Sequence, residues 1–174
     1  MKKDYPTMEQ KLTVESIEKE VRIVKLPRMR MIRSPIGNPE EPNGKLQEFY
    51  KWALCELFNN EEEYPYGGGT PLFSVDNNGF QFLVKVNDDF VNTPGWEEFN
   101  FTGGLYAVFS AWMPEMLTKY EQFNIWLENS SIYKADKDAE KEGRLVMSHI
   151  VTPPALQEKL QNEQHDIFVP IQLK

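Results

Sequence analysis

The sequence predicts an α+β fold made of two βαββ repeats with pseudo-twofold symmetry, in which the strands form an antiparallel sheet with the helices on one face. Two observations support this prediction. The order strand, helix, strand, strand occurs twice along the 174 residues, in repeats that cover residues 21–87 and 103–174. A chain of this length also suits one hydrophobic core, since single cores usually hold roughly 100–200 residues. We therefore expect a single domain at 21–174, preceded by a polar tail at 1–20.

The first repeat begins with a strand at 21–33, where methionines alternate with arginines as on a strand with one polar face. Pro27 indicates a bulge or an edge position within it, because proline donates no ladder hydrogen bond. Residues 45–59 carry apolar side chains at helical spacing. Two short strands follow, and the second, at 80–87, has aromatic or β-branched residues at every second position. The turn residues at 76–79 predict that these two strands form a hairpin.

The second repeat follows a segment at 87–104 that we expect to be a loop. Residues 105–112 alternate as a strand does, and a helix at 114–127 begins with a proline, which suits a first turn. Strands are then predicted at 144–151 and 166–173. Because both repeats contain the same elements in the same order, they should leave a cleft between them. Such clefts are favoured positions for small-molecule pockets.

Composition excludes several classes of protein. The net charge of −8 argues against direct binding to nucleic acid, which needs cations opposite the phosphates. No apolar run approaches the roughly 20 residues that a membrane helix needs, and no apolar stretch of signal-peptide length follows the N-terminal lysines. The single cysteine, Cys55, excludes an internal disulfide framework. We therefore expect a cytoplasmic protein that binds neither membranes nor, directly, nucleic acid.

Three motifs resemble those of a known family. They are GGLYAVF at 103–109, WLENSSIY at 126–133 and DIFVPI at 166–171. In this order they are similar to landmarks of the gyrase-inhibitor-like (GyrI-like) effector-binding family, and the resemblance covers residues 21–174. It implies a duplicated βαββ fold with a ligand cleft between the repeats, often used as the sensor half of a transcription regulator. Because the segment before the first strand is too short for a helix-turn-helix domain, we expect a standalone form.

The sequence departs from this family at one position. The resemblance implies that multidrug-sensing members carry a buried glutamate on the penultimate strand, where it pairs with cationic ligands. The matching stretch here, at 146–150, reads VMSHI and contains no acid. Since an unpaired buried charge is costly, we expect neutral or weakly anionic aromatic ligands to bind better than flat organic cations. Glu97 or Glu98 could replace the missing acid by swinging in from the preceding loop.

Candidate binding residues come from three places. Acidic and aromatic residues in the loop at 87–104 suit the rim of a pocket, although a solvated acidic loop anchored by its aromatic side chains explains them equally well. Two aromatic residues share one face of the strand at 105–112. On the strand at 144–151, a histidine could hydrogen-bond or protonate a ligand, or be satisfied at the edge of the core. The expected ligand-binding residues are Trp96, Glu98, Tyr106, Trp112, Met147, His149 and Phe168.

We predict no catalytic residue, metal ligand or cofactor. The sequence contains no G-x-S-x-G or H-E-x-x-H motif, and two histidines with one cysteine cannot build a usual zinc site. Cys55 lies among apolar residues of a predicted helix, which favours a buried structural thiol over a nucleophile. The pair His165-Asp166 lies where a strand begins and is interpreted as part of a turn.

Together these features predict a small-molecule-binding sensor or effector-binding module without its own DNA-binding domain, which binds an aromatic or hydrophobic ligand between the repeats. We expect a binding protein rather than an enzyme. One alternative is a hydrolase of a hydrophobic small molecule, with Tyr, Trp and Glu side chains positioning water. Another is a protein partner: an inhibitor of an enzyme such as gyrase, with an acidic surface that imitates DNA. Turnover of the ligand would separate the first two functions, and binding of a protein without ligand would indicate the third.

Overall fold

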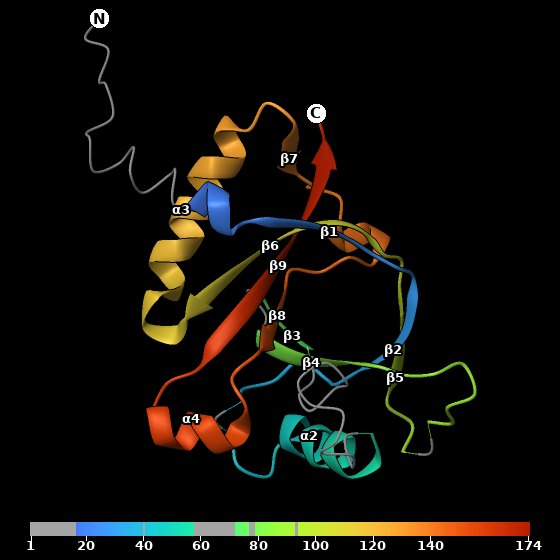
Figure 1. The fold of residues 1–174 in the computed structure, drawn as a ribbon. Helices are drawn as coiled ribbons and strands as arrows, with labels where there is room; N and C mark the ends of the chain where they lie inside the picture. Colours follow the sequence, from blue (N-terminus) through green and yellow to red (C-terminus); the bar gives the residue numbers. More distant parts are fainter. Residues whose placement is uncertain (1–16, 40, 58–71, 77–78, 93) are drawn as a thin grey trace, which may run out of the picture.

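The computed structural model describes residues 17–39, 41–57, 72–76, 79–92 and 94–174 (Figure 1). It confirms the predicted α+β fold with an antiparallel sheet. The described strands are β1 (Arg22–Leu26), β2 (Met29–Arg33), β3 (Leu72–Asp76), β4 (Gly79–Lys85), β5 (Glu97–Phe101), β6 (Gly104–Trp112), β7 (Tyr133–Ala135), β8 (Met147–Ile150) and β9 (Gln164–Leu173). The described helices are α2 (Lys45–Glu56), α3 (Met116–Asn129) and α4 (Pro154–Leu160), with short 3-10 helices η2 (Met113–Glu115) and η3 (Glu140–Glu142).

The sheet has the strand order β1-β6-β9-β8-β3-β4-β2-β5, and β7 pairs separately with β9. The predicted hairpin is present, because β3 pairs with β4 and places Asp76 opposite Gly79. The strand β8 pairs with β9 in the same antiparallel way. Where the two repeats meet, β3 pairs with β8 through one registered pair, Phe73 and Ser148. We call this junction the seam.

Two predicted segments, one strand and one loop, differ in the structure. The strand expected at 21–33 is interrupted at Pro27 and Arg28, so that β1 pairs with β6 whereas β2 pairs with β4 and β5. The segment expected to be a loop at 87–104 contains β5, which continues into β6 after a bend. At the bend between β5 and β6, Gly103 has a φ of +74°, and an added Cβ would lie 2.6 Å from the carbonyl oxygen of Leu26, beside the bend between β1 and β2. Only glycine fits this close approach without displacing the backbone.

Other predictions fall partly outside the described residues. Of the tail expected at 1–20, residues 1–16 lie outside, whereas 17–20 are helical and Ile17 is fully buried in the cluster beneath α3. The predicted helix at 45–59 ends at Glu56, and its last two positions lie outside.

Both α2 and α3 cover the same face of the sheet. Residues directly opposite each other on neighbouring strands share a face, and one such row runs Phe109, Ile167, Ser148, Phe73 and Phe82. At one end of the row α3 buries Phe123 and Leu127, and at the other end α2 buries Phe49 and Ala53. None of the described helices combines the length and the apolar character that crossing a membrane requires.

The opposite face of the sheet is closed on itself. Its buried cluster takes residues from strands near both ends of the sheet, which requires the sheet to curl around them, as Figure 1 shows. We call this cluster the closed core; its buried members are Met31, Leu83, Phe101, Tyr106, Val108 and Met147.

Candidate functional site

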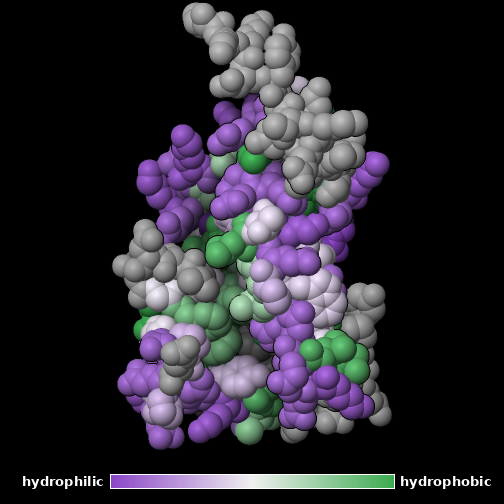
Figure 2. Space-filling model, turned by 90° about the vertical axis from the view of Figure 1, so that its left-hand side faces the viewer, coloured by the Kyte–Doolittle hydropathy of each residue, from purple (hydrophilic) through white to green (hydrophobic). Residues whose placement is uncertain are grey.

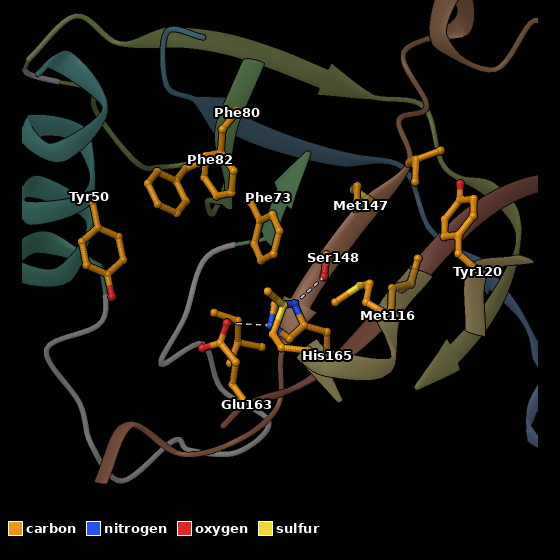
Figure 3. A pocket seen from close by; sticks show the side chains of 14 residues that line it. Tyr50, Phe73, Phe80, Phe82, Met116, Tyr120, Met147, Ser148, Glu163 and His165 are labelled. Atoms are coloured by element: carbon orange, nitrogen blue, oxygen red, sulfur yellow. Dashed lines mark hydrogen bonds and ion pairs between the residues drawn. The ribbon is translucent and has the colours of Figure 1, made fainter. Parts of the chain in front are cut away.

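A cavity of about 650 Å³ lies over the seam, on the helix-covered face of the sheet (Figure 3). The strands β3, β4, β8 and β9 form its floor, and α2 and α3 contribute to its sides. Hydrophobic residues gather in a central hollow on the face drawn in Figure 2. The described residues that line the cavity are Tyr50, Phe73, Phe80, Phe82, Met113, Met116, Tyr120, Val146, Met147, Ser148, Ile150, Glu163, His165 and Ile167.

Aromatic side chains of the first repeat form one wall. The strict alternation of β4 points Phe80 and Phe82 to the same face, and Phe73 lies directly opposite Phe82 on β3. The rings of Phe73 and Phe80 are stacked with centroids 4.8 Å apart. On α2, Tyr50 stacks on Phe82 at 5.1 Å. These contacts hold the rings in fixed positions and give the cavity a broad apolar surface.

A short chain of polar groups lies next to Phe73, whose ring packs edge-on against the imidazole of His165 with centroids 5.5 Å apart. The imidazole of His165 joins the hydroxyl Oγ of Ser148 at Nδ1, 3.0 Å away, to the carboxylate Oε1 of Glu163 at Nε2, 2.8 Å away. The side chain of His165 is only 3% exposed, whereas that of Glu163 is 29% exposed. We call Ser148, His165 and Glu163 the polar chain. Because an ionised carboxylate only accepts hydrogen bonds, Nε2 carries the proton and Nδ1 of a neutral ring accepts from Ser148.

Two tyrosines are the other polar residues among the described part of the lining. Burial raises the pKa of the hydroxyl of Tyr50 and that of Tyr120 above its ordinary value. Both phenols therefore stay neutral at neutral pH, as groups that can donate or accept one hydrogen bond. Among the described residues, no three His, Cys, Asp or Glu side chains gather closely enough to hold a metal ion.

Of the ligand-binding residues expected from the sequence, Met147 is in the lining. Its side chain is 1% exposed and also belongs to the closed core. The other six do not line this cavity. Tyr106 and Phe168 pack in the closed core with ring centroids 6.5 Å apart, and the hydroxyl of Tyr106 donates to the carbonyl oxygen of Leu145 at 3.3 Å. Burial raises the pKa of Tyr106 well above its usual range.

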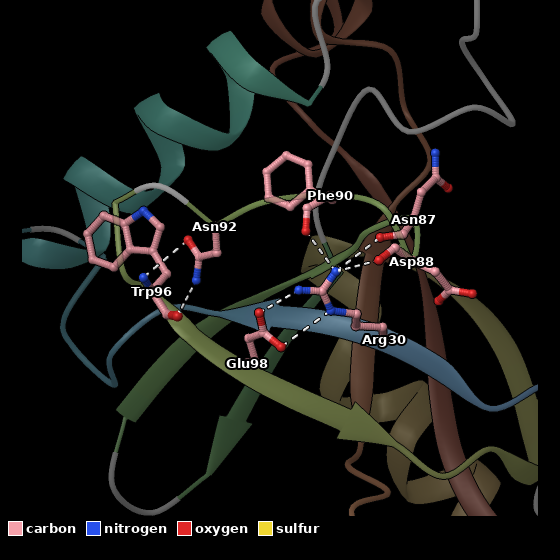
Figure 4. Close-up of polar contacts among 7 residues, drawn as sticks. All are labelled: Arg30, Asn87, Asp88, Phe90, Asn92, Trp96 and Glu98. Carbon is pink, nitrogen blue, oxygen red and sulfur yellow. Dashed lines mark hydrogen bonds and ion pairs between the residues drawn. The ribbon is translucent and has the colours of Figure 1, made fainter.

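The residues of the predicted rim lie under and beside α2. Trp96 packs against Phe49 and Trp52, with centroids 5.3 and 6.1 Å away, and so anchors its segment to the core. Glu98 on the edge strand β5 accepts from Arg30 at 2.5 Å. Arg30 also donates to the carbonyl oxygens of three residues of the preceding loop, which fixes that loop (Figure 4).

Neither acid proposed as a substitute for the missing glutamate reaches the cavity. Hydrogen bonds from Arg33 to Glu97 and from Arg30 to Glu98 engage both carboxylates and lower the pKa of each. The stretch 146–150 holds no acid, as expected, but among the described residues Glu163 lines the cavity and was not one of the residues expected from the sequence. A carboxylate is therefore present in the lining at another position, just before β9.

The remaining expected residues lie at other faces or edges. His149 is registered with Asp166, whereas the neighbouring Ser148 and Ile150 line the cavity, so period-2 alternation turns His149 away from it. Trp112, at the end of β6, lines two smaller depressions outside the cavity, one of them with Leu160.

Two residues to which the sequence assigned only a structural role lie elsewhere than expected. Cys55 is exposed rather than buried, because it falls on the outer side of α2. His165 is not part of a turn: it is the second residue of β9, paired with Ala111 and Ile150. A signal for His165 was present in the sequence, since it shares strand periodicity with the buried Ile167 and Val169.

No family model matches the chain, and no curated protein matches it in sequence. Several solved structures are similar in fold. A hydrolase from Listeria innocua superposes with a TM-score of 0.59 at 10% identity, over 88% of this chain and 92% of that one. An uncharacterized conserved protein from the same organism gives 0.55 at 10% identity with the same coverage. A protein named SAV2435, bound to tetraphenylphosphonium, gives 0.48 at 13% identity, over 88% of this chain and 94% of that one. At these identities the similarity establishes the fold.

Proposed function

We propose that this protein is a small-molecule-binding module of the GyrI-like effector-binding type, and that its ligand is a hydrophobic, aromatic compound held at the seam. The observation that carries the proposal is the cavity of about 650 Å³ between the two repeats. Cavities that bind small organic molecules commonly measure about 300–1,000 Å³ and combine apolar walls with a few polar groups. This cavity has that size and that composition.

The lining supports an aromatic ligand in particular. Phe73, Phe80 and Phe82 offer ring faces and edges that a flat ring system can contact by stacking or by edge-to-face packing. Beside these rings, the polar chain and the two tyrosine hydroxyls provide the hydrogen-bonding groups that fix the orientation of a ligand. A sensor needs this combination, because apolar burial supplies affinity and placed polar groups supply selectivity.

Binding of the neutral aromatic probe N-phenyl-1-naphthylamine tests the proposal. Its fluorescence should rise saturably with the parent protein. The variant Met116→Trp places extra bulk into the cavity, since Met116 lines it on α3, and should weaken binding about tenfold or more. The adjacent Leu117 is 81% exposed and outside the lining, so Leu117→Trp is the matched control and should bind like the parent. Equal affinity of the parent and a folded Met116→Trp would overturn the proposed site.

A further inference from the structure

The polar chain contains more than a binding protein needs. Ser148 on β8 and His165 on β9 lie on adjacent strands, and Glu163 immediately precedes β9, so the sheet places all three on one wall of the cavity (Figure 3). The hydrogen bonds run from hydroxyl to imidazole to carboxylate, over 3.0 and 2.8 Å. This is the order of nucleophile, base and orienting acid that activates a serine.

The hydrogen bond to Glu163 determines what the imidazole can do. With the proton held at Nε2, the lone pair of Nδ1 faces the hydroxyl of Ser148. The ring is almost fully buried, so it has little freedom to rotate away. When Nδ1 takes up a proton, the neighbouring carboxylate stabilises the imidazolium that forms. The imidazole is thus placed to accept the proton of Ser148, and the carboxylate of Glu163 is placed to stabilise the resulting cation.

Structural satisfaction of buried polar groups does not by itself account for the chain. Apolar side chains of similar volume at these positions would complete the wall without the desolvation that polar and charged groups cost, and such replacements are often neutral or stabilising. The cavity also adjoins Ser148, His165 and Glu163 directly, so a bound molecule can contact them. Polar groups that only serve the fold do not need this access.

We propose that Ser148 is an acylatable nucleophile and that the cavity hydrolyses esters of hydrophobic acids, an inference that rests on the proposed function of the cavity as a ligand site. Oγ of Ser148 attacks the carbonyl carbon while its proton passes to Nδ1 of His165. The bond to the alcohol breaks, and that proton leaves on the alcohol, so an acyl-serine remains. Water then attacks the acyl-serine, gives a proton to Nδ1, and releases the acid as the proton returns to Oγ. Glu163 is a positioning residue throughout.

The experiment uses 4-nitrophenyl hexanoate with the full-length protein. We expect a burst of 4-nitrophenolate stoichiometric with protein, a mass increase of one hexanoyl group, and its location on the peptide that contains Ser148. Ser148→Ala should abolish the burst and that label. His165→Asn removes the base and should slow acylation by about 10²–10⁴-fold.

Glu163→Gln should lower the acylation rate constant at saturation with little change in KM, whereas a structural role alone would not confine the loss to the rate constant. Ser74→Ala, which removes a buried serine from β3 outside this cavity, should leave the burst unchanged. A label at another residue, or a burst that persists in Ser148→Ala, would overturn the proposal. Binding of N-phenyl-1-naphthylamine by the parent protein without any acylation would overturn the esterase alone and leave the proposed ligand site in place.

Discussion

The two faces of the sheet are packed in different ways. On one face the sheet curls around the closed core, where Phe101 and Tyr106 are fully buried. On the other face α2 and α3 each cover their own half with a separate cluster, and the cavity lies over the seam between them. Strand β8 contributes to both faces, with Met147 in the closed core and Ser148 at the cavity. Strand alternation thus lets one segment contribute to the core on one face and to the cavity on the other.

Truncation of one aromatic side chain on each face should show this difference most strongly. Phe101→Ala empties a fully buried site in the closed core and should lower the free energy of unfolding by about 3–5 kcal/mol. Phe80→Ala removes a partly exposed ring that already borders the cavity, and should cost about half as much or less. Urea unfolding of both variants measures the two values. Equal losses would contradict the distinction between a closed and an open face.

The close approach of Gly103 to Leu26, at the bends of the curled sheet, offers a sharper test. Gly103→Ala should lower the free energy of unfolding by about 2–4 kcal/mol, because the new Cβ meets the Leu26 carbonyl and the positive φ is strained. Gly95 has nearly the same φ, +75°, with no atom within 4 Å of an added Cβ. Gly95→Ala should therefore cost only about 1 kcal/mol, the conformational part. Thermal unfolding compares the two, and similar shifts would show that the close approach does not matter.

The smallest effect on stability should come from substitutions in the edge strand β5, which carries two exposed ion pairs. Glu97 and Glu98 have lowered pKa values because Arg33 and Arg30 donate to them. Their contribution to stability is present above the carboxyl pKa of the unfolded chain and is lost as the pH falls through the lower pKa of the folded protein. The double variant Glu97→Gln, Glu98→Gln should show a slightly weaker loss of stability on acidification than the parent, since exposed pairs contribute little. Urea midpoints across acidic pH measure this, and a stronger loss in the variant would contradict it.

Periodicity was enough to predict the fold class. Alternation in β4 and helical spacing in α2 and α3 are strong local signals, and their repeated order indicated two similar halves. The strand β5 was missed although Phe99 and Phe101 alternate with Glu98 and Asn100. It is an edge strand with charged side chains, and it follows proline and glycine, which are typical of loops.

The site was harder to predict than the fold, because strand alternation sorts residues onto two faces without showing which face borders a cavity. Alternation shows that Met147 and His149 share one face and that Ser148 and Ile150 share the other, but it does not show which face the helices leave open. That depends on where α2 and α3 pack. Likewise, Tyr106 and Phe168 have the aromatic character of pocket residues, yet their register directs them into the closed core.

Strand β1 precedes α2 but pairs with β6 of the second repeat, so neither repeat completes its sheet alone. Contacts such as Leu26 with Gly104 join segments far apart in the sequence. Long-range contacts of this kind form only after a large loop has closed, which slows folding. We therefore expect slow, all-or-none folding in which the two repeats acquire structure together. A chain cut between them should not leave one folded half.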